Sequence, residues 1–386
     1  MTVSYWQDAG REEELVCDVV VVGGGIVGSY AARLLRAAGR DVVLLEARDI
    51  ARGATGRNAG MVLLGLADSY AVAIKRWGRE TARELWGLTA TNRERTRALL
   101  AELGVPSEPC GSLILAGDEA EADDLARSAT ALAEDGFAVA YHPRDPLGRG
   151  FVAGLAQPDD LTLDPVRFTG AIAAAATAEG VTILRDSEVF AIEQGAGGAG
   201  LTIRSRRATV RCGAALLATN AYSALLHPFF AGLIRPVRAQ MLATAPAPRV
   251  LTTAVYANRG YEYIRQLADG RILLGGGRAG FREAEIGYVD ETTPSLQAFL
   301  EGFLRRHFPE VDAPVTHRWS GTMGFTPDGI PLVGRLPDLP GVWFAAGFGG
   351  HGLGIGLVSA ERAVAGLLHG TGPGVLDAAR LAGVRA

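Results

Sequence analysis

The pattern of apolar and polar positions predicts a strand–helix–strand unit near the start of the chain. Continuous apolar runs at 17–22 (CDVVVV) and 41–46 (DVVLLE) are typical of parallel strands that are buried on both faces. Between them, the apolar positions of 27–38 repeat with a helical period and end at Gly39. A glycine turn joins the first strand to this helix. The segment therefore predicts a βαβ unit of about thirty residues.

Similar patterns along the chain predict further elements. We expect helices at 77–103, 118–136 and 165–180, and one from the glycine-rich loop after 346 to about residue 368. Strands are expected at 112–116, 181–184, 201–204, 209–211, 214–218, 262–267, 271–274 and 342–346. Asp269-Gly270 indicates a hairpin, and the glycine patch 195–200 predicts a hairpin tip.

These elements predict an α/β fold with an α+β second lobe. Units typical of a parallel sheet occur in three separate places, so we expect a discontinuous Rossmann-like domain made of 1–70, 150–222 and 318–386. The remaining segments, 71–149 and 223–317, would form a substrate domain around an antiparallel sheet. A length of 386 residues is ample for two lobes.

Composition and charge exclude several classes of function. The net charge is −4 without basic blocks, which argues against nucleic acid and anionic membrane surfaces as partners. Three widely spaced cysteines without a CxxC pair predict neither a disulfide framework nor a metal site, and fit a reducing cytoplasm. The apolar stretch 342–360 is interrupted by glycines and a histidine, so no membrane span is predicted.

The glycine turn carries a dinucleotide fingerprint. In Gly23-x-Gly25-x-x-Gly28, the glycines permit a tight turn, close approach of a pyrophosphate and close helix–strand packing, while the helix amides stabilise the phosphates. Glu46 ends the second strand, where a carboxylate accepts hydrogen bonds from ribose hydroxyls and repels the 2′-phosphate of NADP. FAD and NAD both stay open on this evidence. The predicted contacts are Gly23, Gly25, Ile26, Val27, Gly28, Glu46 and Ala47.

Several stretches together resemble a known family. They are SYWQD at Ser4–Asp8, the fingerprint with Glu46, GATGRNAG at Gly53–Gly60, Leu163-Asp164-Pro165, Val189, Leu217-Ala218-Thr219, Trp319-x-Gly321, TPDGIPLVG at Thr326–Gly334 and AAGFGGHGLG at Ala345–Gly354. In this order they resemble the D-amino-acid-oxidase-like FAD-dependent oxidoreductases, which include glycine oxidase, sarcosine oxidase and gamma-glutamylputrescine oxidase. Asn220 departs from the glycine usual in that family. The resemblance implies FAD, with flavin-side contacts at Thr55, Arg57, Asn58, Ala59, Gly60, Val189, Thr219, Gly321, Gly347, Gly349, Gly350, His351, Gly352 and Leu353.

The C-terminal glycine loop has a physical reason to bind flavin. Reduced flavin is negatively charged along its N1–C2=O edge, and a glycine-rich loop that opens a helix offers unpaired amides and a positive dipole end. Close packing is the alternative explanation for such a loop. His351 either hydrogen-bonds flavin or substrate, or is satisfied by the backbone.

The resemblance also implies how the flavin is held. Some relatives attach FAD through a cysteine near the TPD motif or through a histidine in an early loop. Gly321 stands at the first place, the first histidine of the chain is His142, and no cysteine lies between Cys17 and Cys110. We therefore predict non-covalent FAD.

On the substrate side, the resemblance implies transfer of a hydride from a C–H beside an amine nitrogen to flavin N5, followed by imine hydrolysis. No His/Asp/Ser constellation suggests a dedicated base. The positions that bind the substrate carboxylate in relatives fall on Met323, Gly354 and Leu63, which leaves Arg259 and Arg278 open for that role.

We predict His351, Tyr261 and Tyr263 as catalytic or pocket residues. The two tyrosines share one face of their strand, although core packing explains them equally well. The lysine that assists oxygen in sarcosine oxidase falls on Leu273, so oxygen and another electron acceptor both stay open.

Three functions follow as hypotheses. The leading one is an amine or amino-acid oxidoreductase that works as an oxidase on a small-molecule substrate. The others are a 2-hydroxy-acid or glycerol-phosphate-type dehydrogenase, and a flavoprotein that acts only as an assembly factor, since a fold alone is weak evidence for function.

Overall fold

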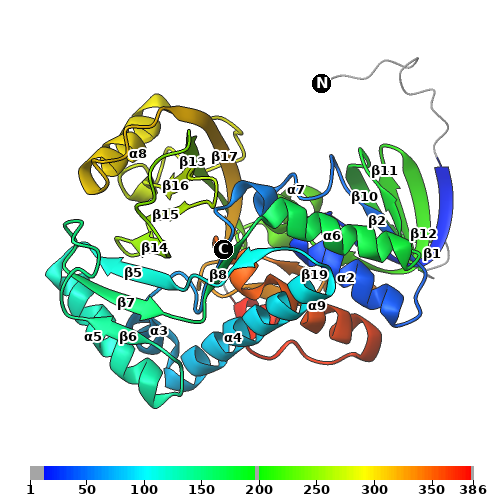
Figure 1. The fold of residues 1–386 in the computed structure, drawn as a ribbon. Coiled ribbons are helices and arrows are strands. Elements are labelled where there is room, and N and C mark those ends of the chain that lie inside the picture. Colours follow the sequence, from blue (N-terminus) through cyan, green and yellow to red (C-terminus); the bar gives the residue numbers. More distant parts are fainter. Residues whose placement is uncertain (1–12, 196–199, 384–386) are drawn as a thin grey trace.

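The structure, a computed structural model, describes residues 13–195 and 200–383. Within them lie two sheets of eight strands each and a small sheet of three. Figure 1 shows the two large sheets side by side, with α2, α6 and α9 against the first and α8 beside the second. Ser4–Asp8 and the interior of the glycine patch 195–200, with its predicted hairpin tip, lie outside the described residues.

The first sheet confirms the predicted βαβ unit. Its parallel core has the order β19-β12-β1-β2-β9, and α2 connects β1 to β2. Three further strands join it antiparallel, namely β10 and β11 beside β12, and β18 beside β19. The bounds are β1 Glu13–Val22, α2 Ile26–Ala37, β2 Val42–Leu45, β9 Thr182–Leu184, β10 Val189–Gln194, β11 Leu201–Ser205, β12 Ala208–Leu217, β18 Leu332–Arg335 and β19 Val342–Ala346.

The second sheet has the order β17-β13-β16-β15-β14-β5-β7-β6. Its neighbours are antiparallel except for β14 and β5, which run parallel. Helix α8 packs on β13 and β16, and α5 packs on β5 and β7. The bounds are β5 Ser112–Ala116, α5 Glu119–Glu134, β6 Ala140–His142, β7 Ala153–Gln157, β13 Arg235–Thr244, β14 Ala254–Ala257, β15 Glu262–Gln266, β16 Ile272–Gly276, α8 Pro294–His307 and β17 Val315–Phe325.

The division of the chain into two domains stays a prediction. Strands β7 and most of β17 fall within the segments assigned to the cofactor domain, yet both are hydrogen-bonded in the second sheet. The small sheet, formed by β3 Met61–Val62, β8 Leu161–Leu163 and β4 Ser107–Glu108, lies where the segments meet.

Several predicted elements differ from the structure. The helix predicted at 77–103 is confirmed as α4 (Arg79–Glu102), but it starts only after Gly78. The left-handed φ of 85° at Gly78 separates α4 from α3 (Tyr70–Trp77), a helix that was not predicted. The strands predicted at 209–211 and 214–218 are one continuous strand, β12. The other helices are α6 Pro165–Ala178, α7 Ser223–Leu226 and α9 Gly352–His369, with 3-10 turns η1 Ala54–Arg57, η3 Asn220–Tyr222, η4 Pro228–Phe230, η5 Arg278–Gly280, η6 Gly374–Leu376 and η7 Ala378–Leu381.

Alternate residues of β1 enter different hydrophobic cores, as a strand buried on both faces requires. Val19 and Val21 face the core that contains α2 and α9, whereas Val20 and Val22 face the core beneath β10–β12. A third core lies between the second sheet and α8. Across the described ranges, no helix is both long and apolar enough to cross a membrane.

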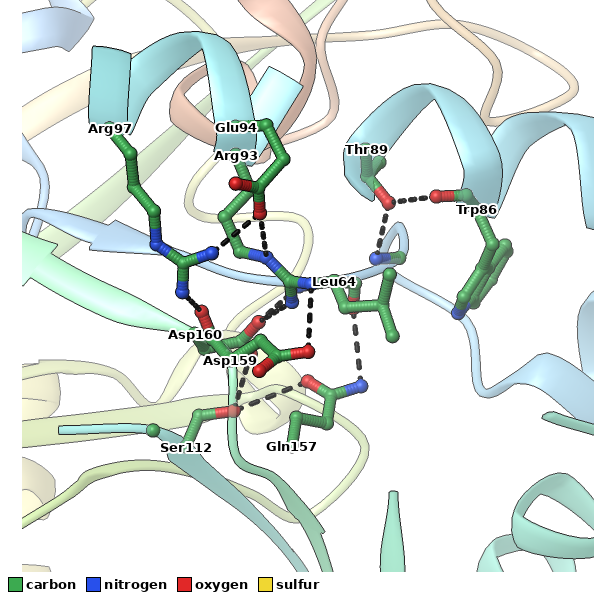
Figure 2. A network of polar contacts seen from close by, with 12 residues as sticks. Leu64, Trp86, Thr89, Arg93, Glu94, Arg97, Ser112, Gln157, Asp159 and Asp160 are labelled. Atoms are coloured by element: carbon green, nitrogen blue, oxygen red, sulfur yellow. Dashed lines mark hydrogen bonds and ion pairs between the residues drawn. The ribbon is translucent and has the colours of Figure 1, made fainter. Parts of the chain in front are cut away.

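A buried polar network joins α4 and the loop after β3 to strands β5 and β7 of the second sheet (Figure 2). Asp160, fully buried before β8, accepts from Arg93 of α4 at 2.8 Å, from the Leu64 amide at 3.0 Å and from the Ser112 hydroxyl at 2.7 Å. Gln157 of β7 donates to the Leu64 carbonyl. The network thus holds the loop after β3 against both the second sheet and α4.

Candidate active site

A single cavity of about 780 Å³ runs from the glycine turn after β1 to the second sheet. Its walls come from the N-terminal ends of α2 and α9, the ends of β2 and β12, the loop around η1, and strands β14, β15 and β17. The carboxyl ends of parallel strands are the usual binding edge of such a sheet. None of the three cysteines lines this cavity, and His351 is the one histidine among its described lining residues.

The first end of the cavity has the features that a dinucleotide requires. Gly23 has a φ of 106°, and a Cβ there would lie 2.8 Å from the Ala218 carbonyl oxygen. Gly25, the residue just before α2, has no side chain to cap the helix, and the first turn of α2 contains no acidic residue. The positive end of the helix dipole is therefore open toward the cavity and suits a pyrophosphate.

Glu46 is held in place by two backbone amides. Its carboxylate accepts from the Gly24 amide at 2.6 Å and from the Arg48 amide at 2.9 Å. These contacts fix the carboxylate at the cavity wall beside the glycine turn, where it suits ribose hydroxyls.

The loop around η1 is tied to the glycine turn. The Thr55 hydroxyl accepts from the Ile26 amide at 3.1 Å. Asn58 donates to the Thr55 carbonyl at 2.7 Å and accepts from the Gly60 amide at 2.7 Å, so its side chain mainly shapes the loop. Arg57 donates to the Ser320 carbonyl at 2.7 Å and pairs with Asp290. The loop therefore spans from α2 to β17.

The C-terminal glycine loop meets the middle of the cavity. Gly347, Gly349 and Gly350 have φ of 76°, 56° and 87°, a conformation that side chains disfavour. Asn220 steadies this loop, because its amide oxygen accepts from the Gly347 amide at 3.0 Å. Helix α9 then begins at Gly352 without an acidic residue in its first turn. Its N-terminus can stabilise negative charge on a bound ligand.

Tyr256, Tyr263 and His351 form the other end of the cavity. The rings of Tyr256 and Tyr263 stack at 6.3 Å, and the Tyr256 hydroxyl lies 3.4 Å from His351 Nε2. His351 Nδ1 lies 3.2 Å from the Gly349 carbonyl oxygen. A neutral ring protonated on Nδ1 satisfies both contacts.

Burial keeps these groups uncharged. It lowers the pKa of His351 and raises the pKa of Tyr263 to about 12. The pKa of Tyr256 is raised too, again chiefly by burial. At neutral pH, this end of the cavity therefore offers neutral hydrogen-bonding groups rather than an ionised base.

Most of the residues predicted from the sequence line the cavity, but four do not. Gly28 packs α2 against the turn, since a Cβ there would lie 1.8 Å from the Gly23 carbonyl oxygen. Gly60 allows close backbone packing, since a Cβ there would lie 2.1 Å from the Leu163 carbonyl oxygen, and the Gly347 amide donates to Asn220. The Tyr261 hydroxyl accepts a hydrogen bond from Arg282 outside the cavity. Those that line it are Gly23, Gly25, Ile26, Val27, Glu46, Ala47, Thr55, Arg57, Asn58, Ala59, Val189, Thr219, Gly321, Gly349, Gly350, His351, Gly352, Leu353 and Tyr263.

Other residues that line the cavity were not among the predicted site residues. They include Tyr256, Asn220, Asp290, Met61 and Phe348. Tyr256 lies in β14, a strand that was not predicted, and it reaches the cavity because β14 pairs with β15. For Asn220 the sequence held a signal, namely asparagine where the family has glycine, since both residues tolerate the left-handed φ of 45° that the structure shows there.

Comparisons with known proteins agree with this geometry. Residues 18–365 match the family described as DAO, FAD dependent oxidoreductase. The chain is 30% identical to glycine oxidase of Pseudomonas aeruginosa over 374 residues, which cover 94% of this chain and 97% of that protein. It is 26% identical to gamma-glutamylputrescine oxidoreductase of Escherichia coli over 359 residues, 88% of this chain and 81% of the relative.

Solved structures show the same fold. L-proline dehydrogenase from P. horikoshii superposes with a TM-score of 0.82 at 23% identity and covers 97% of this chain and 100% of its own. Glycine oxidase from Geobacillus kaustophilus superposes with a TM-score of 0.76 at 24% identity and covers 92% and 94%.

Proposed function

The chain belongs to the FAD-dependent oxidoreductase family, and on that basis we propose that it oxidises a C–N bond of an amine or an N-substituted amino acid to an imine. It is an oxidoreductase with non-covalent FAD as its cofactor. The names of two relatives, glycine oxidase and gamma-glutamylputrescine oxidoreductase, support an amine or amino acid as the substrate. A reducing, cytoplasmic location is part of the proposal and is supported by three free cysteines.

The observation that carries the proposal is the continuity of the cavity. The glycine turn and Glu46 at one end, and Tyr263 and His351 at the other, line the same space. Bound FAD supplies the hydride acceptor, flavin N5. The adenosine end of the cofactor fits the glycine turn, while the α9 N-terminus suits the negative charge that reduction adds.

The chain's own residues contribute positioning rather than proton abstraction. His351 is neutral at pH 7 because burial lowers its pKa, and the Tyr256 hydroxyl donates toward Nε2. Protonated Tyr263 offers a hydrogen bond to the substrate. Such a site holds an uncharged amine with its C–H bond aimed at the acceptor and excludes water from the reaction.

The proposed reaction balances as a two-electron oxidation. The C–H bond beside nitrogen would break, and its electron pair would leave with the hydrogen as a hydride that the cofactor accepts. The nitrogen lone pair would form the new C=N bond, and the N–H proton would pass to solvent. Water then hydrolyses the released imine to a carbonyl compound and an amine. Molecular oxygen is the proposed electron acceptor, and its two-electron reduction yields hydrogen peroxide.

The test is anaerobic mixing of the purified holoenzyme with amines, N-methyl amino acids, amino acids and 2-hydroxy acids. We expect the visible absorption band of FAD to bleach with a nitrogen substrate and to return on admission of air, with peroxide formed. Bleaching by hydroxy acids alone would overturn the amine proposal. A flavin that no substrate bleaches would instead support the assembly-factor alternative.

A further inference from the structure

Arg278 follows a sharp backbone turn that two glycines with positive φ form. It opens η5 directly after Gly276 and Gly277, whose φ are 110° and 74°. A Cβ on Gly276 would lie 1.8 Å from the Tyr261 carbonyl oxygen, and one on Gly277 would lie 2.7 Å from the Phe299 ring. These two glycines turn the chain sharply at the end of β16 and bring Arg278 to the cavity wall.

Aromatic rings hold the Arg278 guanidinium by its faces. It lies 4.9 Å from the centre of the Phe325 ring and 5.4 Å from that of Tyr261. No hydrogen bond or ion pair to residues 13–195 or 200–383 involves this guanidinium. Stacking orients a guanidinium but leaves its N–H edge free.

The other arginines that line the cavity, and Arg259, either pair with a carboxylate or lie exposed at the dinucleotide end. Arg57 pairs with Asp290, and Arg206 pairs with Glu188 at 2.8 Å. Arg48 is exposed beside Glu46 at the dinucleotide end. Arg259, which the sequence left open, binds both oxygens of Asp118 at 2.8 and 2.9 Å. Arg278 is therefore set apart as a cation with a free edge near the catalytic end.

Among the described residues, no carboxylate forms an ion pair with Arg278, and Asp68, whose charge also acts on His351, pairs with Arg76. The lining of the same cavity includes Met61, Leu63 and Met323, which have no charge, and the stacked tyrosines. The charge of Arg278 lowers the pKa of His351 further, after burial, so the histidine does not carry a second positive charge at neutral pH. A cation in a partly apolar cavity gains most from a ligand that brings a negative charge.

We propose that Arg278 binds the carboxylate of the substrate through its free N–H edge, so that the enzyme selects amines that carry a carboxylate over uncharged or purely cationic amines. This rests on the proposed function and names its substrate class. A planar carboxylate matches the two parallel N–H groups of one guanidinium, whereas a phosphate dianion calls for more cations than this end supplies.

The test compares wild-type holoenzyme with R278M, R278K and the matched control R282M. Arg282 lies 5.1 Å from the same Tyr261 ring but is exposed and does not line the cavity. Acetate and benzoate are titrated against each protein, with the change in the visible flavin spectrum as readout, and acetamide, benzamide and inorganic phosphate as comparison ligands. FAD content and thermal stability show whether each variant is folded.

We expect carboxylates to perturb the wild-type spectrum, the amides to have little effect, and R278M to bind carboxylates about 10- to 100-fold more weakly. R278K should recover part of the affinity, and R282M should match wild type. The inference is overturned if wild type binds no carboxylate, if phosphate binds and carboxylates do not, or if R278M and R282M behave alike.

Because this titration needs no turnover, it is independent of the proposed reaction. If substrates are found, R278M should raise KM for carboxylate-bearing amines much more than for their amides while kcat changes little. An enzyme that binds carboxylates through Arg278 but oxidises only hydroxy acids would refute the proposed function, while the carboxylate-binding role of Arg278 would stand.

Discussion

Asn220 connects the end of β12 to the glycine loop before α9. Its left-handed φ of 45° is tolerable for asparagine, and its amide oxygen accepts from the Gly347 amide. N220G keeps the backbone conformation and removes the acceptor, so we expect about 1 kcal/mol less stability and weaker FAD binding. Urea unfolding of the apoprotein and titration with FAD measure the two effects. An N220G protein that matches wild type in both would show that the contact is dispensable, while N220D, which keeps an acceptor, is the control.

Replacement by alanine should have opposite effects on protein stability at two helical glycines, Gly28 and Gly87. A Cβ at Gly28 would lie 1.8 Å from the Gly23 carbonyl oxygen, whereas at Gly87 in α4 it would meet no atom within 4 Å. We expect G87A to stabilise the protein by about 0.5–1 kcal/mol, and G28A to destabilise it and to weaken FAD binding. Urea unfolding checks the first, and FAD titration the second. Equal effects of the two substitutions would contradict this.

At the scale of elements, α4 positions α9 through one buried side chain. Asn92 donates to the Leu353 carbonyl at 2.8 Å and accepts from the Leu357 amide at 2.9 Å, so it inserts into the first turns of α9. N92A leaves these groups without their partner, and we expect a loss of about 1–3 kcal/mol in unfolding free energy together with weaker FAD binding. T91A is the control, since the Thr91 hydroxyl bonds only within α4 at an exposed site. An N92A variant as stable as T91A would count against this role.

Elements with a local signal were predictable from the sequence. The strand at 17–22 and the turn at Gly23 follow from an apolar run and glycine spacing, which depend on residues close together in the chain. Helix α9 likewise begins at the predicted loop. Helix α3 was missed because its eight residues, which end just before Gly78, are too few to show a clear helical period.

The other wall of the cavity depends on long-range pairing. Tyr256 and Tyr263 meet because β14 and β15 are neighbours, and Arg278 meets Phe325 although 47 positions separate them in the numbering. No periodicity in 223–314 specifies the order of those strands. Sequence patterns therefore predicted the residues that line the glycine-turn end of the cavity, while Tyr256 and its neighbours at the other end required the tertiary structure.

At the scale of the whole molecule, the buried network around Asp160 ties the second sheet and α4 to the loop that leads into the cavity (Figure 2). Leu63, next to Leu64 of this network, lines the cavity. Burial raises the pKa of Asp160 from 3.8 to about 6, even though Ser112 and Arg93 favour its ionised form. The protonation state of the Asp160 carboxyl is thus linked to the free energy of unfolding.

This linkage predicts a pH dependence with a definite sign. Between pH 3.8 and about 6 the folded chain holds the Asp160 proton more tightly than the unfolded chain, so its contribution to stability falls as pH rises through that window. Above it, the contribution is constant. D160N cannot titrate there, so the unfolding free energy of wild type minus that of D160N should decrease from pH 3.8 to about 6 and then level off.

Urea unfolding at a series of pH values measures this difference. D159N is the matched control, because Asp159 also binds Arg93, at 3.3 Å, yet its side chain is 49% exposed. A difference between wild type and D160N that rises with pH would mean that Arg93 and Ser112 outweigh burial and hold Asp160 ionised in the fold. The direction of the slope therefore decides whether desolvation or hydrogen bonding dominates where the second sheet, α4 and the loop after β3 meet.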